Sequence, residues 1–300
     1  MTLKDRTPVE RRFYTLRDGE ISACHFGDRN RPVAVVMLHA NGFNGLTYRT
    51  LLEPLGVHSL ALDLRGHGMS RLPTDIEGLK NWHIFRDDVI EFFDRYIDGP
   101  VILAGHSYGA VTGVLAVAEI KDKIRGYVGF DPVLVPDLFR WLSGFASIRA
   151  RMKKSIPIAR SAGHRKSVFE SYEAALDRYT GRGAFKAFSQ NALEDYLMGG
   201  LKPHGEAVQL ACDPKWEQAI FVAQRHNIFK NVKYLPENTH IISAGKGPVS
   251  TVFTRAKIRA RLQGGRLDFE KDLSHLFPMQ KETYSIKCLS EVLKKAGLKD

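Results

Sequence analysis

The first half of the chain alternates short apolar runs with longer amphipathic stretches. Four runs are almost continuously apolar and are bounded by turn residues, which is typical of strands covered on both faces, as in a parallel sheet. Three stretches with helical spacing of their apolar residues separate these runs. This alternation predicts an α/β fold with a doubly wound, mostly parallel sheet and a ligand site at the carboxyl ends of its strands. The expected strands are 32–38, 58–62, 100–104 and 124–130, and the expected helices are 47–55, 82–97 and 109–120.

The pattern changes in the second half. Residues 133–235 contain helix-period segments separated by Gly and Pro, with one convincing strand candidate at 207–212. We expect this stretch to form a mainly helical cap inserted into a core made of residues 1–132 and 236–300. Insertions of this kind often serve as lids over a site. Strand patterning returns at 240–244, a short strand is expected at 266–269, and an amphipathic helix is expected at 284–298.

Composition excludes disorder and gives no sign of a bound metal. The chain has 300 residues, of which 44% are hydrophobic, enough to form a buried core. Cys24, Cys212 and Cys288 lie far apart without metal-ligand spacing, which favours reduced thiols in a cytosol-like compartment. The first residues are polar, and no apolar run reaches the roughly 20 residues of a membrane span. We therefore expect a cytoplasmic protein without a membrane span, metal or cofactor.

The net positive charge of the chain bears on what kind of molecule it binds. The chain has 44 Lys and Arg against 33 Asp and Glu, a formal net charge of +11 that attracts anions. No nucleic-acid-binding motif accompanies this charge and the basic residues are scattered, so no nucleic-acid partner is expected. Part of the charge falls in the predicted cap, between Arg140 and Arg182. This favours a small anionic substrate, while a monomer and a homodimer both remain open.

The strongest chemical signal is a Gly-x-Ser-x-Gly motif at residues 105–109. It follows an apolar strand and precedes a helix of small residues, the context of a nucleophile elbow. Gly105 and Gly109 leave room for the tight turn, and the helix directs its first N–H groups at charge forming beside Ser107. A chance match in a turn is the alternative, but the flanking elements favour Ser107 as a nucleophile. His106 should face away from Ser107 and be packed in the core.

Two further motifs follow the first two expected strands. Residues 38–43 read Leu-His-Ala-Asn-Gly-Phe, and residues 63–70 read Asp-Leu-Arg-Gly-His-Gly-Met-Ser. Together with the elbow, these motifs are similar to those of the α/β-hydrolase family, and the resemblance extends over nearly the whole chain. Within that family, the chain resembles serine hydrolases with a cap, of the esterase and lipase type. We expect the polar residues of the 63–70 turn to hold that loop together, without a catalytic role.

The resemblance implies an oxyanion hole built from backbone N–H groups. One donor would be the N–H of Tyr108, and the other would come from the loop that contains Asn41, Gly42 and Phe43, with Asn41 preferred. Ala40 stands where the family more often has Gly. An ordinary Asn-Gly turn is the alternative interpretation of this loop.

The family order of nucleophile, acid and base implies His275 as the general base. His240 also follows the insertion, but it begins a strand and so lies at the wrong end of the sheet. The usual acid position, after the strand at 240–244, holds Gly247. We expect Asp131, at the end of the preceding strand, to supply the carboxylate instead. The alternative is that Asp131 merely ends its strand.

These residues predict a serine hydrolase that cleaves a small to medium carboxylic ester through an acyl-enzyme. Hydrolysis of a carbon–carbon bond, lactone or amide would use the same residues. Chemistry that needs an Asp nucleophile is disfavoured, because Ser107 occupies that position. The gap at Gly247 supports a different class, a non-catalytic binding protein with this fold.

Overall fold

A computed structural model describes residues 8–299 and contains one eight-stranded sheet. The strand order is β1-β2-β4-β3-β5-β6-β10-β11, and every pairing from β4 to β11 is parallel. The expected α/β fold with a mostly parallel sheet is confirmed. The strands are β1 (Glu10–Leu16), β2 (Gly19–Phe26), β3 (Val35–Leu38), β4 (Ser59–Asp63), β5 (Val101–His106), β6 (Ile124–Phe130), β10 (Thr239–Lys246) and β11 (Arg266–Ser274).

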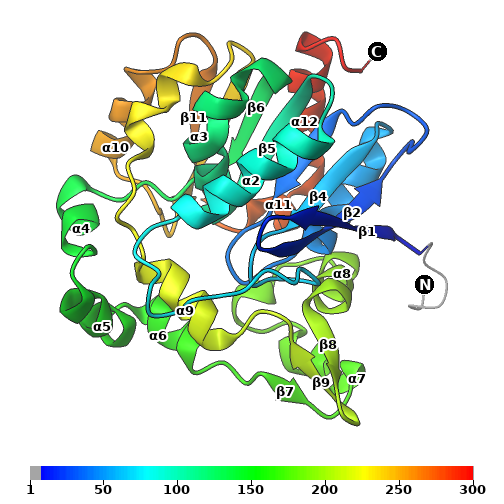
Figure 1. Cartoon of the computed structure of the whole chain (residues 1–300), viewed down its shortest axis with the longest axis vertical. Helices are drawn as coiled ribbons and strands as arrows, with labels where there is room; N and C mark the ends of the chain where they lie inside the picture. Colours follow the sequence, from blue (N-terminus) through cyan, green and yellow to red (C-terminus); the bar gives the residue numbers. More distant parts are fainter. Residues whose placement is uncertain (1–7, 300) are drawn as a thin grey trace.

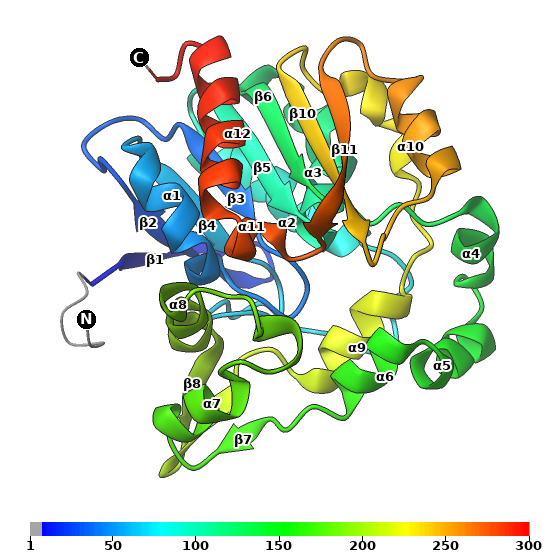
Figure 2. The ribbon, with the colours of Figure 1, turned by 180° about the vertical axis from the view of Figure 1, so that it is seen from behind.

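Helices cover both faces of this sheet, as Figures 1 and 2 show from opposite sides. Alternate residues of β3 belong to two separate apolar clusters: Val36 and Leu38 to the one that includes α2 and α3, and Val35 and Met37 to the other. Because both faces are buried, the strand reads as a continuous apolar run. The helices are α2 (His83–Tyr96) and α3 (Tyr108–Ile120) on one face, and α1 (Arg49–Leu52), α11 (Phe277–Gln280) and α12 (Glu282–Lys295) on the other, with α10 (Val252–Arg259) near the β11 edge.

Two strands of the large sheet, β1 and β2, were not predicted from the sequence pattern. β1 and β2 form an antiparallel hairpin, and β2 joins the sheet antiparallel to β4. β1 is an edge strand with charged residues such as Arg11 and Arg12, and β2 buries the polar residues Ser22 and His25, so neither reads as an apolar run. β11 is also longer than the short strand expected there.

The chain leaves the sheet at the end of β6 and forms the expected helical insertion, which lies below the sheet in Figures 1 and 2. The insertion also holds a three-stranded antiparallel sheet in the order β7-β9-β8, where one strand was expected. β7 is too short, and β8 too polar, to give a strand pattern. The bounds of the cap domain, 133–235, stay a prediction. The elements are α4 (Asp137–Leu142), α5 (Ala146–Ser155), α6 (Pro157–Gly163), β7 (Val168–Phe169), α7 (Tyr172–Tyr179), α8 (Gln190–Gly200), β8 (Leu201–His204), β9 (Ala207–Leu210) and α9 (Pro214–Val222).

No helix within residues 8–299 is both long enough and apolar enough to cross a bilayer. The three cysteines are buried and free of disulfides.

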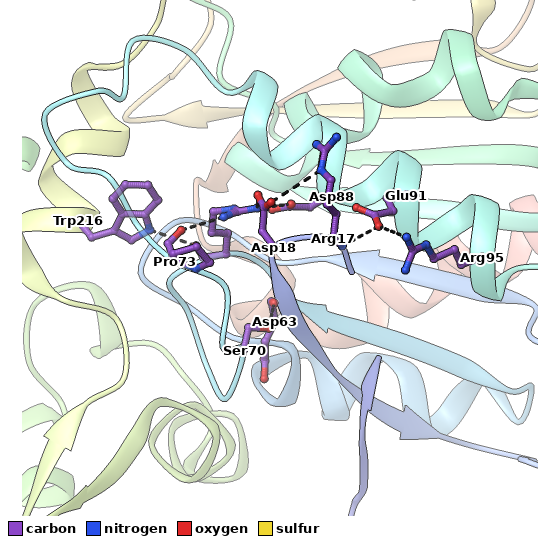
Figure 3. Close-up of polar contacts among 10 residues, drawn as sticks. Arg17, Asp18, Asp63, Ser70, Pro73, Asp88, Glu91, Arg95 and Trp216 are labelled. Carbon is purple, nitrogen blue, oxygen red and sulfur yellow. Dashed lines mark hydrogen bonds and ion pairs between the residues drawn. The ribbon is translucent and has the colours of Figure 1, made fainter. Parts of the chain in front are cut away.

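A buried arginine organises the turn after β4. Arg65 donates to both carboxylate oxygens of Asp88, at 2.9 and 2.6 Å, and to Asp18 and the carbonyl of Pro73. Its own carbonyl accepts from the indole N–H of Trp216 in the insertion, and Figure 3 shows these partners around the turn. Burial raises the pKa of Asp88 to about 6 in spite of the hydrogen bonds from Arg65. As expected from the sequence, Arg65 has a structural task.

Replacing Arg65 with Met should lower the free energy of unfolding by about 3–5 kcal/mol, because it leaves the buried Asp88 carboxylate without its partner. Asp18→Asn removes the exposed partner of the same arginine and should cost less than about 1 kcal/mol. Urea denaturation followed by circular dichroism measures both. Equal, small losses in the two variants would contradict this account of the turn.

Candidate active site

Ser107 lies at the apex of a strained turn between β5 and α3. Its backbone has φ 55° and ψ −114°, a conformation that residues other than glycine rarely adopt. A Cβ at Gly105 would lie 2.6 Å from backbone atoms of Ala110, and one at Gly109 would lie 2.3 Å from the carbonyl oxygen of Leu38. The turn therefore requires glycine on both sides of Ser107. This is the local geometry expected of the elbow.

The structure brings Ser107, His275 and Asp131 together from three separate strand ends. His275 Nε2 lies 2.9 Å from Ser107 Oγ, and His275 Nδ1 lies 2.6 Å from Asp131 Oδ2. Since the carboxylate can only accept, Nδ1 carries the proton and the Nε2 lone pair faces the serine hydroxyl. The three side chains form one connected set of hydrogen bonds.

Asp131 is buried and fixed from both sides. Its φ is +42°, its N–H donates to the carbonyl of Ile242 at 2.7 Å, and its Oδ1 accepts from the N–H of Ala244 at 2.9 Å. Gly247, at the usual acid position, has a φ of +68°, and a Cβ built there would meet nothing within 4 Å. The carboxylate beside His275 thus comes from the end of β6, and its role as the acid stays a prediction.

His106 is fully buried and contacts the site through its ring nitrogens. Nε2 donates to the carbonyl of His275 at 2.8 Å, so Nδ1 accepts, and its donor is the hydroxyl of Tyr48 at 2.7 Å. That hydroxyl in turn accepts from the N–H of Ala40 at 3.0 Å. Burial lowers the pKa of His106 well below its usual value, which keeps the ring neutral. The packed histidine therefore connects the loop after β3 to the backbone of His275, a link with no signal in the sequence.

The four candidate N–H groups of the oxyanion hole differ in whether they are already engaged. The N–H of Gly42 donates to His67 Nε2 at 3.1 Å, and the N–H of Phe43 donates to the carbonyl of Ala40 at 3.0 Å. Within residues 8–299, the backbone N–H groups of Asn41 and Tyr108 have no such acceptor. Tyr108 is the first residue of α3, whose N–H has no partner inside the helix. Only these two candidates are free to donate to a substrate.

Buried neutral histidines hold the loop after β3 against the turn after β4. His39 Nε2 accepts from the N–H of Leu64 at 2.9 Å, while its Nδ1 donates to Ala40. His67 accepts from Gly42 and donates from Nδ1 to the carbonyl of Arg65 at 3.0 Å. Burial lowers the pKa of His39 to about 4 and that of His67 to about 3, so both act as acceptors at neutral pH.

A small cavity of about 10 Å³, near the minimum for one water molecule, borders the loop after β3. Its lining combines this loop with the insertion: Gly42, Phe43, Gly68, Arg165, Tyr196, Gly200, Leu210 and Cys212.

A larger hollow lies elsewhere, beside His240 at the start of β10, where His240 pairs with Asp268 at 2.9 Å. This position supports the exclusion of His240 as a base for Ser107. No group of three or more metal-ligating side chains is placed to hold a metal within residues 8–299.

Comparison with known proteins places the chain in a family. The family model described as the alpha/beta hydrolase family matches residues 35–282, and the chain belongs to that family. It is 22% identical over 307 residues to the alpha/beta hydrolase domain-containing protein VTE7 of Arabidopsis thaliana, covering 95% of this chain and 82% of that protein. It is 27% identical over 159 residues to esterase Rv0045c of Mycobacterium tuberculosis, covering 53% of this chain and 49% of the esterase.

Solved structures share the fold at low sequence identity. The E-2-(acetamidomethylene)succinate hydrolase superposes with a TM-score of 0.74 at 18% identity, covering 96% of this chain and 100% of that hydrolase. The Rv0045c esterase of Mycobacterium tuberculosis superposes with a TM-score of 0.70 at 20% identity, covering 96% of this chain and 93% of the esterase. The fold and its helical insertion are thus those of this family.

The lowered histidine pKa values should make the protein less stable in acid. An unfolded histidine takes up a proton near pH 6.5, whereas His39 and His67 resist protonation until about pH 4 and 3. Falling pH therefore favours the unfolded chain, and stability present above about pH 6.5 is lost progressively below it. Between about pH 7 and pH 5 we expect a loss of roughly 2 kcal/mol for each of these histidines.

Urea denaturation at several pH values measures this loss, and nuclear magnetic resonance of the two imidazoles follows their protonation directly. A flat stability profile, or protonation of both rings near pH 6.5, would contradict the expected trend.

Proposed function

We propose that this chain is a serine hydrolase that cleaves small to medium carboxylic esters through an acyl-enzyme. The observation that carries the proposal is the connected set of hydrogen bonds from Asp131 through His275 to Ser107. Membership of the alpha/beta hydrolase family supports hydrolysis in general, and the likeness to an esterase supports an ester substrate.

In the first half of the reaction, Ser107 Oγ attacks the ester carbonyl and its proton passes to His275 Nε2. The backbone N–H groups of Asn41 and Tyr108 stabilise the negative charge that develops on the carbonyl oxygen. The carbon–oxygen bond to the alcohol then breaks, and His275 returns its proton to the departing alcohol. An acyl group remains on Ser107.

Water completes the cycle. His275 removes a proton from a water molecule, which attacks the acyl carbon, and the proton then passes to Ser107 as the carboxylic acid leaves. Throughout, Asp131 holds the imidazole in the tautomer with Nδ1 protonated and stabilises the imidazolium form. The same residues could cleave a carbon–carbon bond, lactone or amide, and the substrate decides among these reactions.

A fluorophosphonate probe should label wild-type protein at Ser107, because only an activated serine hydroxyl attacks it. Ser107→Ala should remove both the labelling and the turnover of p-nitrophenyl butyrate. Mass spectrometry locates the label, and heat-denatured protein serves as the control for non-specific reaction. A folded wild-type protein that neither labels nor cleaves the ester would favour the non-catalytic alternative.

Asp131→Asn should lower kcat for p-nitrophenyl butyrate by about 10³–10⁴-fold, because the amide stabilises the wrong imidazole tautomer. Asp268→Asn is a matched control, since Asp268 also pairs with a histidine but near the start of β10. Thermal denaturation of both variants separates loss of catalysis from loss of folding. Full activity in folded Asp131→Asn would assign the acid to another residue.

A further inference from the structure

A charged side chain from the insertion lines the cavity beside the loop after β3. Arg165 follows α6, and its side chain is only 19% exposed. It donates to Glu217 Oε2 at 2.8 Å and to the Tyr179 hydroxyl at 3.3 Å, and it also donates to the hydroxyl of Tyr196. Its guanidinium carbon lies 5.5 Å from the ring centroid of Tyr179. The guanidinium is thus held in one place by aromatic partners and a single carboxylate.

The carboxylate of Glu217 occupies space directly against the loop that carries the free N–H of Asn41. Its Oε1 lies 2.5 Å from the position that a Cβ on Gly42 would take. The backbone carbonyl of Glu217 also accepts from Asn41 Nδ2 at 2.9 Å. Glu217 lies in α9, so one residue of the insertion covers this loop with both its side chain and its backbone.

The acyl chain of a substrate would compete for this space. If the carbonyl oxygen of an ester accepts from the N–H of Asn41, the two groups attached to the carbonyl carbon lie next to the loop that contains Gly42, and we place the acyl group on the side of Glu217. The cavity of about 10 Å³ between this loop and Arg165 is too small for an acyl group, so an acyl group can enter this space only if the neighbouring carboxylate of Glu217 moves. Arg165 would then lack the counterion that its partly buried position requires.

We propose that Arg165, Tyr179 and Tyr196 form a carboxylate subsite, which Glu217 fills when no substrate is bound. The acyl part of the substrate then carries a second carboxylate, which replaces that of Glu217, so the substrate class is the monoester of a dicarboxylic acid. The planar guanidinium suits a carboxylate, and the resident partner is itself a carboxylate. This inference rests on the proposed ester hydrolysis and identifies its substrate class.

The test compares two methyl esters of the same chain length, monomethyl glutarate and methyl pentanoate, which differ by a carboxylate in place of a methyl group. The measured quantity is the ratio of their kcat/KM values, followed by methanol release. Wild type should prefer monomethyl glutarate. The double variant Arg165→Gln/Glu217→Gln removes both charges without leaving one buried alone, and the ratio should fall by about 10- to 100-fold.

Two single variants sharpen the comparison. Glu217→Gln removes the competing carboxylate and should raise the ratio several-fold above wild type. Arg160→Gln removes an exposed positive charge from the same part of the insertion and should leave the ratio unchanged. A ratio that falls equally in Arg160→Gln and the double variant would assign the preference to overall charge and overturn the subsite.

The subsite and the proposed function can fail separately. If wild type labels at Ser107 and cleaves methyl pentanoate, but the double variant keeps the wild-type ratio, the subsite is wrong and the hydrolase proposal stands. If wild type neither labels nor cleaves either ester, the hydrolase proposal fails. Isothermal titration with glutarate then decides the subsite: binding to wild type that the double variant loses supports it, and no binding overturns it.

Discussion

The hydrogen bond between His275 Nδ1 and the Asp131 carboxylate is the contact on which the geometry of the site depends. It selects the imidazole tautomer and turns Nε2 toward Ser107. Asp131 can make this contact only because β10 supplies the N–H of Ala244 and the carbonyl of Ile242 to hold it. The parallel pairing of β6 with β10 places Ile242 beside Phe130, and it therefore helps to fix the position of Asp131 in the site. Two residues with positive φ, Ser107 and Asp131, cost about 1–3 kcal/mol each, and the surrounding sheet offsets that strain.

Neutral imidazoles join the loops at the carboxyl ends of the strands. A neutral imidazole has one donor and one acceptor, so each ring can join two polar groups that would otherwise lie unpaired in the interior. His67 joins Gly42 to Arg65, and His106 joins His275 to Tyr48. Burial lowers the pKa of both rings and keeps them uncharged, and a protonated ring would lose its acceptor and release the N–H of Gly42 or the hydroxyl of Tyr48.

The central strands, the elbow and the family could be predicted from the sequence because each leaves a local signal. Strands buried on both faces give apolar runs, and the turn at Ser107 needs glycine two residues away on each side. Chain order left His240 and His275, the position of His240 at the start of a strand favoured His275, and glycine at residue 247 led to Asp131. The structure places these side chains together, while their catalytic roles stay predictions.

Other features leave no local signal. The edge strand β1 and the short or polar strands β7 and β8 bury too little to show an apolar pattern. The pair of Arg165 and Glu217 joins residues 52 positions apart, and its meaning depends on a loop more than a hundred residues earlier. Only the folded chain brings the insertion over Gly42.

The position of Asp131 also changes what the loop after β10 has to do. In a chain with the acid at residue 247, that loop must hold a carboxylate in register with the imidazole. Here Gly247 faces open space, with no atom within 4 Å of where a side chain would begin. With the Asp131 carboxylate beside His275, this segment does not have to supply one, although Val249 still accepts from the N–H of Leu134, three residues after Asp131. A side chain that carries a reporter group at residue 247 would therefore begin without a clash, at a position left empty by the shift of the carboxylate to β6.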